Sequence, residues 1–155
     1  MNIFYVDSSP VISAKQLVDK HIVKMPLETA QLLCCAFPSG EAPYKRTHYN
    51  HPSAVWTRKS KENYQWLIEH GIALCGEYKR RYERDHKCLS VINWCSDNIH
   101  KLSFESTGFV EPPQCMPEEC KVVGNSVIAY QNYYNTHKKD MYKWKNMSPP
   151  SWAHV

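Results

Sequence analysis

The segment Asp19–Gln31 carries the clearest set of reactive side chains in this sequence. If the segment is helical, its polar residues follow one another at steps of four, four and three, on one face beside His21: Lys20, Lys24, Glu28 and Gln31. A carboxylate held among cations in a groove can stabilise an oxocarbenium ion or move protons during cleavage of a glycosidic bond. The same pattern also fits an amphipathic surface helix with a Lys24–Glu28 pair, which would contribute roughly 0.2–0.5 kcal/mol. The residues alone leave both interpretations open.

A second polar cluster, His48, Asn50 and His51, directly precedes Pro52. Two histidines three residues apart in a polar loop can orient a phosphate or a base turned out of its helix, and we treat all three as candidate substrate contacts. The alternative is an ordinary solvated turn. In either case we expect Asn50 to cap a short helix that contains Trp56, because Asn is a favoured N-cap residue.

Two regions interleave basic and aromatic residues, at 79–84 and 138–145. Such patterns suit phosphate contacts combined with stacking on bases. The candidates are Arg81 in the first region and Lys143, Trp144 and Lys145 in the second. The alternatives are a charged helix end and a tail whose aromatics pack on the core. The net charge of +4 permits an anionic partner without requiring one.

Several other chemistries find no support in the sequence. It contains no phosphate-binding glycine loop, no GxSxG and no HExxH. Its seven cysteines include no CxxC pair, and we expect Cys34, Cys35 and Cys75 to be buried free thiols. We therefore expect no metal and no cofactor. No apolar run approaches the ~20 residues of a membrane span, and the N-terminus lacks the features of a signal peptide. These features predict a cytoplasmic monomer without membrane contact.

The elements that must position these residues are predicted to be helices. Apolar residues recur at helical spacing, most clearly over residues 60–82, where we expect Gly71 to allow close packing of another helix. A helical run from Ser9–Pro10 to about residue 38 either kinks or restarts at Pro26. Further helices are expected at 86–101 and 125–139, an irregular loop at 103–124, and at most one short strand at 2–6. The prediction is an all-α fold, a single domain over residues 1–155 with a basic aromatic tail at 138–155.

The order of these motifs resembles the phage pyrimidine-dimer DNA glycosylase (endonuclease V) family and its bacterial relatives. The run Leu17–Val23 followed by Glu28 is similar to the family's first helix, which has its catalytic glutamate at the matching distance. Asn50-His51-Pro52 with Trp56, then the helix over Glu62–Arg81, repeat the family's order, and a basic aromatic tail is a family trait. The likeness covers residues 1–84 and the tail, and leaves out 86–124.

This resemblance implies an all-α fold, binding of bent DNA, nucleotide flipping, and glycosidic cleavage followed by strand scission. It puts Glu28 in the place of the catalytic glutamate, with Lys20 and Lys24 near positions where family arginines meet phosphates. The family nucleophile is the α-amine of a small residue exposed by loss of the initiator Met and followed by an arginine. This chain begins Met1-Asn2-Ile3, and because Asn2 is large we expect Met1 to stay.

Three amines can therefore take the nucleophile's role: the α-amine of Met1, Lys20 and Lys24. An α-amine loses its proton more readily than a lysine, with an ordinary pKa of about 8 against about 10.4. The sequence predicts a DNA N-glycosylase for damaged or modified bases, with or without an abasic-site lyase step. The alternative is a catalytically inactive accessory protein of the same fold that binds DNA, RNA or a nucleotide.

Overall fold

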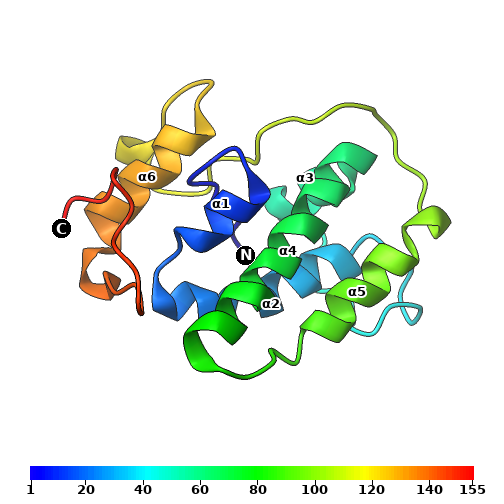
Figure 1. Ribbon diagram of the computed structural model, residues 1–155. Coiled ribbons are helices and arrows are strands. Elements are labelled where there is room, and N and C mark those ends of the chain that lie inside the picture. The colour runs from blue at the N-terminus through cyan, green and yellow to red at the C-terminus, as the bar shows by residue number, and fades with distance from the viewer.

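The structure, a computed structural model that describes residues 1–155, is built from helices without a sheet (Figure 1). The α-helices are α1 (Pro10–Lys15), α2 (Asp19–Cys34), α3 (Pro52–Lys59), α4 (Lys61–Tyr82), α5 (Leu89–Asp97) and α6 (Ser126–His137). Three short 3₁₀ turns are η1 (Ile99–Lys101), η2 (Glu118–Cys120) and η3 (Lys139–Met141). The all-α prediction is confirmed, and residues 1–5 form no strand.

Helix α4 lies at the centre and packs against α1, α2, α3 and α5. It begins where the Ser60 hydroxyl accepts a hydrogen bond from the Asn63 N–H at 3.1 Å, and it ends at Glu83, whose φ of 58° is left-handed. A Cβ at Gly71 would lie 2.9 Å from a methyl of Thr29 on α2 and 3.0 Å from one of Ile92 on α5. The predicted close packing at this glycine is confirmed.

The first helical run breaks at residues 16–18, before α2 begins. Pro26 lies buried inside a continuous α2, so the interpretation in which a helix restarts at Pro26 is wrong. At the actual break Val18 is extended, and the Asp19 N–H donates to the carbonyl of Lys143 at 2.8 Å. A tail residue thus satisfies a first-turn donor of α2 that has no partner within the helix.

The cap of α3 also differs from the prediction. His51, and not Asn50, is the N-cap, because the His51 Nδ1 accepts the Ser53 N–H at 3.1 Å. Pro52 at the first helical position needs no hydrogen bond of its own, so the next free N–H belongs to Ser53. Asn50 is exposed one residue earlier.

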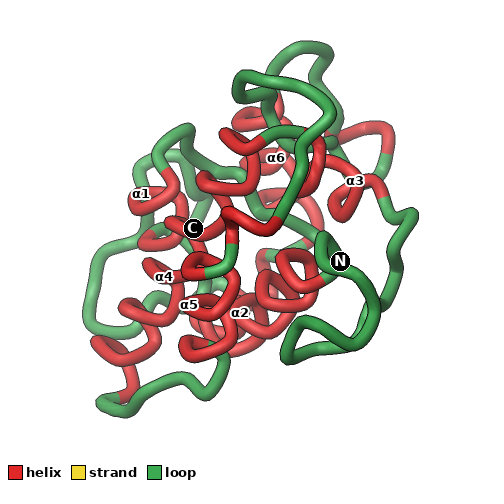
Figure 2. Tube along the Cα trace, turned by 90° about the vertical axis from the view of Figure 1, so that its right-hand side faces the viewer, coloured by secondary structure: helices red, strands yellow, loops and turns green.

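The long loop 103–124 is irregular as predicted, apart from η2, and its backbone is tied to α3 and α4. The Val110 N–H donates to the Asn63 Oδ1 at 3.0 Å, and the Trp56 indole N–H donates to the Val110 carbonyl at 2.7 Å. The loop then reaches α6, which Figure 1 shows at the side of the helices around α4. Figure 2 shows the loops that run over one side of the molecule near the N-terminus.

The N-terminal segment is part of the core. Ile3, Phe4, Tyr5 and Val6 are each at most 5% exposed, and the ring of Phe4 contacts the rings of Tyr130 and Tyr134 on α6. This burial of residues 3–6 holds Met1 close to the core.

The free cysteines at 34, 35 and 75 are buried, as predicted. No helix is both long and apolar enough to cross a membrane.

Candidate active site

The α-amine of Met1 lies beside the carboxylate of Glu28. Its nitrogen is 3.5 Å from the Glu28 Oε1, and the Asn2 N–H donates to the same oxygen at 3.3 Å. The Lys24 Nζ lies 3.4 Å from the other oxygen, Oε2. The Glu28 side chain is only 14% exposed, whereas Lys24 is 69% exposed. A partly buried carboxylate is therefore held among three nitrogens, one of them a primary α-amine.

Asn2 anchors this arrangement from the other side. Its side-chain amide donates to the Cys115 carbonyl at 3.1 Å and accepts from the Tyr130 hydroxyl at 3.3 Å. The same hydroxyl lies 2.6 Å from the Pro113 carbonyl, which competes for its single proton. Loop 103–124 and α6 together thus hold the start of the chain against α2.

His51 belongs to the same electrostatic environment. Its pKa is lowered, mainly by partial burial and to a smaller extent by the positive charges of the Met1 ammonium and His48. The negative charge of Glu28 acts in the opposite direction and raises this pKa. His51 is therefore neutral at pH 7. Because its Nδ1 accepts the Ser53 N–H, the proton is on Nε2, which is left as a donor. His48 is exposed with a left-handed φ of 51°, and its Nδ1 is 2.8 Å from the Thr47 hydroxyl.

A basic cavity of about 450 Å³ lies between α2 and the loop over residues 44–47. It is lined by Leu27, Gln31, Tyr44, Lys45, Arg46, Thr47 and Lys87. Beside it, the half-exposed ring of Tyr49 has the guanidinium carbons of Arg46 and Arg58 at 4.4 Å and 3.7 Å from its centroid. Tyr49 and Arg58 could not be singled out from the sequence, since only the fold brings Arg46 and Arg58 to one ring.

His21 has a structural role instead of a substrate contact. Its ring is buried, stacks on Phe4 at 4.2 Å, and its Nδ1 is 2.6 Å from the Tyr134 hydroxyl. Burial, with smaller contributions from Lys138 and Lys24, lowers its pKa to about 3. His21 lies about two turns before Glu28 on α2, and its neutral ring joins α2 to α6.

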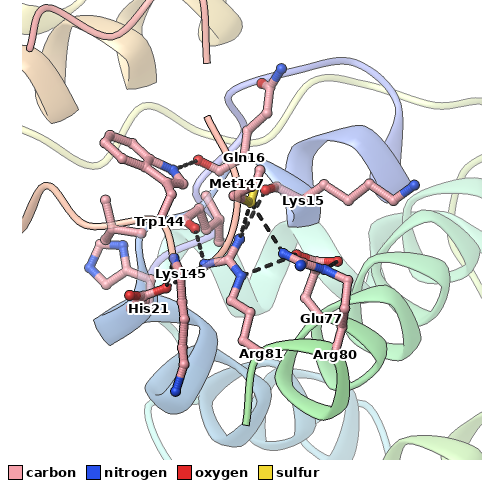
Figure 3. Close-up of polar contacts among 12 residues, drawn as sticks. Lys15, Gln16, His21, Glu77, Arg80, Arg81, Trp144, Lys145 and Met147 are labelled. Carbon is pink, nitrogen blue, oxygen red and sulfur yellow. Dashed lines mark hydrogen bonds and ion pairs between the residues drawn. The ribbon is translucent and has the colours of Figure 1, made fainter. Parts of the chain in front are cut away.

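Arg81 is likewise buried, and Figure 3 shows the polar contacts around its guanidinium. Its side chain is 0% exposed, and all five of its N–H donors are used. The acceptors are the Leu17 and Lys15 carbonyls, Asp19, Glu77 and the Met147 sulfur. Such a guanidinium cannot contact a phosphate without losing these partners, so the predicted DNA contact at Arg81 is corrected to a structural role.

The tail is split between the core and the surface. Trp144 is 8% exposed, and its indole N–H donates to the Gln16 carbonyl at 2.8 Å. Lys143 and Lys145 are exposed. Lys145 shares a cavity of about 330 Å³ with Arg80 at the end of α4 and with Arg84, which follows that helix. The two basic regions predicted separately from the sequence meet here, whereas Trp144 is a packing residue.

The fold and the site define a helical protein in which an N-terminal amine faces a glutamate on the second helix. The family model for pyrimidine dimer DNA glycosylase matches residues 1–90. None of the curated proteins or solved structures compared with the chain matches it. The chain belongs to the pyrimidine dimer DNA glycosylase family, as the motif order in its first half indicated, and this makes it a DNA glycosylase type of protein with DNA as its substrate class.

Proposed function

We propose that this protein releases damaged pyrimidines from DNA by attack of its N-terminal amine on the sugar carbon C1′. The proposal depends on one observation, the 3.5 Å between the Met1 nitrogen and the Glu28 Oε1. An amine attacks only after it has lost its proton, and a carboxylate at this distance can accept that proton. The same carboxylate lies where it can stabilise positive charge that develops on the sugar.

The proposed reaction has two parts. The amine nitrogen forms a bond to C1′ while the glycosidic C1′–N bond breaks, and the base leaves with the bonding electrons and gains a proton. Opening of the sugar ring gives an iminium between the amine and C1′. Loss of a C2′ proton then expels the 3′ phosphate and breaks the strand, and water finally hydrolyses the imine and frees the amine. The second part is the lyase step.

Removal of the initiator Met would leave this chemistry in place. The Asn2 nitrogen is 3.3 Å from the same Glu28 oxygen, so it would present the new α-amine to the same carboxylate. Lys24 remains a competing nucleophile because its Nζ also contacts Glu28. Lys20 lies eight residues before Glu28 on α2, roughly 12 Å along the helix axis, and we assign it to phosphate contact.

DNA would lie across the exposed lysines of α2. On one side is the basic cavity between α2 and the loop over residues 44–47, and on the other are Lys143 and Lys145 in the tail. The ring of Tyr49 and the two guanidinium groups over it form a basic, aromatic surface for the phosphates of a nucleotide turned out of the duplex. His48, Asn50 and His51 lie in the same loop and supply polar contacts to that nucleotide. These features support nucleotide flipping at this site.

The test compares Glu28→Gln with the wild type on duplexes that carry pyrimidine dimers or other modified bases. Binding should survive, since loss of an anion cannot weaken phosphate attraction, while base release should fall by ~10²-fold or more. Glu69→Gln, an exposed carboxylate on α4, is the matched control and should keep full activity. Full activity in Glu28→Gln would refute the proposed role of this carboxylate.

Borohydride reduction identifies the nucleophile. It should trap a covalent protein–DNA adduct, and mass spectrometry of the peptides should place it on the first residue, with Lys24 as the competing site. A form with a short N-terminal extension, which removes the α-amine from this position, should lose the adduct. Trapping that survives the extension would move the attack to a lysine. Absence of both base release and trapping on every lesion would favour the DNA-binding accessory protein.

A further inference from the structure

A mixed cluster of metal-ligand side chains lies apart from the active site, where loop 103–124 meets α6. Glu119 and Cys120 belong to η2, and His137 is the last residue of α6. One ligand atom from each of the three residues lies within 4.8 Å of the other two. The His137 Nε2 is 2.9 Å from the Glu119 Oε1. The spacing along the sequence gave no sign of this cluster, because Cys120 and His137 are far apart and belong to no recognised motif.

The backbone around the cluster is held in place without any ion. The Asn132 side chain on α6 donates to the Cys120 carbonyl at 3.3 Å. Gln114 bridges the loop on both sides of η2, since its amide donates to the Val122 carbonyl at 2.6 Å and accepts the Val122 N–H at 2.9 Å. The backbone that carries the three side chains is therefore largely preformed, which lowers the entropic cost of binding.

We propose that Glu119, Cys120 and His137 form a zinc site, with water as the fourth ligand. A thiolate, an imidazole and one carboxylate suit Zn²⁺, whereas Ca²⁺ and Mg²⁺ prefer several oxygens. Zn–ligand bonds of about 2.0–2.3 Å put tetrahedral ligand atoms roughly 3.3–3.6 Å apart. Because the three ligand atoms already lie within 4.8 Å of one another, the cluster has to close by at most about 1.5 Å to reach this geometry.

The charges of the ligands also suit a zinc ion. Zinc binds a cysteine as its thiolate, so binding would release the thiol proton of Cys120 into solvent. The thiolate and the carboxylate together neutralise the two charges of the ion.

The site would also support the start of the chain. The segment of loop 103–124 that precedes η2 contacts Asn2 through the Cys115 carbonyl, and Tyr130 on α6 contacts both. A metal that joins η2 to α6 would therefore link the two elements that hold Asn2, which are loop 103–124 and α6. This inference does not depend on the proposed reaction, because binding of the ion is measured without DNA.

The test is titration of the reduced, chelator-treated full chain with Zn²⁺ by calorimetry, and with Co²⁺ by absorption spectroscopy. The wild type should bind one Zn²⁺ per chain and show a thiolate-to-cobalt charge-transfer band. Cys120→Ser should lose that band, and both Cys120→Ser and His137→Gln should bind Zn²⁺ at least about 10–100-fold more weakly. His137 is exposed, so its variant should fold even if the buried Cys120→Ser does not.

Two matched controls separate this site from other thiols and imidazoles. Cys115→Ser, in the same loop, and His100→Gln, an exposed histidine in η1, should both bind like the wild type. The absence of one-to-one binding in the wild type would overturn the proposal. Binding that is unchanged in His137→Gln, or equally weakened in Cys115→Ser, would overturn it as well.

Discussion

Replacement of Arg81 by Met should destabilise the fold far more than the same replacement at Arg80. Both arginines contact the carboxylate of Glu77, at 3.1 Å for Arg81 and 3.0 Å for Arg80. They differ in burial, since the Arg81 side chain is 0% exposed and the Arg80 side chain is 42% exposed. Met fills much of the same volume, so the comparison isolates the missing hydrogen bonds and charge.

The expected magnitude follows from the partners that Arg81 leaves behind. Without it, the Leu17 and Lys15 carbonyls lose a donor, and Asp19 and Glu77 lose a counter-ion where water has little access. Loss of one partner from a buried ion pair costs ~3–5 kcal/mol. An exposed pair such as that of Arg80 contributes about 0–1 kcal/mol. For a chain of this length each kcal/mol corresponds to ~2–4 °C in Tm, which gives a fall of ~6–20 °C for Arg81→Met.

The assay is urea unfolding of both variants, followed by circular dichroism and by tryptophan fluorescence. The free energy of unfolding should fall by ~3–5 kcal/mol in Arg81→Met and by no more than about 1 kcal/mol in Arg80→Met. DNA binding at a temperature where both are folded provides a second readout. Equal stabilities for the two variants, or a weaker salt dependence of DNA binding in Arg81→Met alone, would refute the structural role of this guanidinium.

Three further predictions concern the tail, the glycines of α4 and the buried histidine of α2. Replacement of Lys143 and Lys145 by Ala should reduce the slope of log K against log salt by about 0.9 for each phosphate that the variant no longer neutralises. The slope is measured by fluorescence anisotropy of a labelled duplex, and an unchanged slope would exclude these lysines as phosphate contacts. Gly71→Ala should cost ~1–3 kcal/mol through its close neighbours, whereas Gly76→Ala, which has nothing within 4 Å, should gain ~0.5–1 kcal/mol, as urea unfolding can measure. Because burial lowers the pKa of His21 from 6.5 to about 3, only the unfolded chain takes up its proton as pH falls below about 6.5. The stability of the wild type should therefore fall more steeply with acid than that of His21→Gln, by up to ~1.4 kcal/mol per pH unit, and parallel curves would contradict this.

The helices could be predicted from the sequence because burial of an apolar stripe determines most of them. The spacing over 60–82 places α4 to within a residue, and Gly71 indicated the close contact with neighbouring helices. The break before α2 could not be predicted in the same way. It depends on a tail residue, Lys143, that supplies a hydrogen-bond acceptor from far along the chain, whereas Pro26 fits inside α2 despite its missing N–H.

The candidate site was only partly predictable, for a related reason. Residue types and spacing pointed to Glu28 and Lys24, since these face each other one helical turn apart. Nothing local distinguishes Arg81 from its exposed neighbours, and its withdrawal from the surface depends on acceptors from α1, α2 and the tail. The buried state of His21 likewise depends on Tyr134, which lies 113 residues away.

The Met1 amine is held beside Glu28 by the residues that follow it in the chain. A free chain end normally frays unless it is tied down. Here burial of residues 3–6 and the two side-chain hydrogen bonds of Asn2 hold the end in place. The groups that would react lie within residues 1–90, whereas Cys115 and Tyr130, which position Asn2, lie outside that range. The part of the chain beyond the family match therefore contributes to the site by positioning the N-terminus instead of supplying reactive groups.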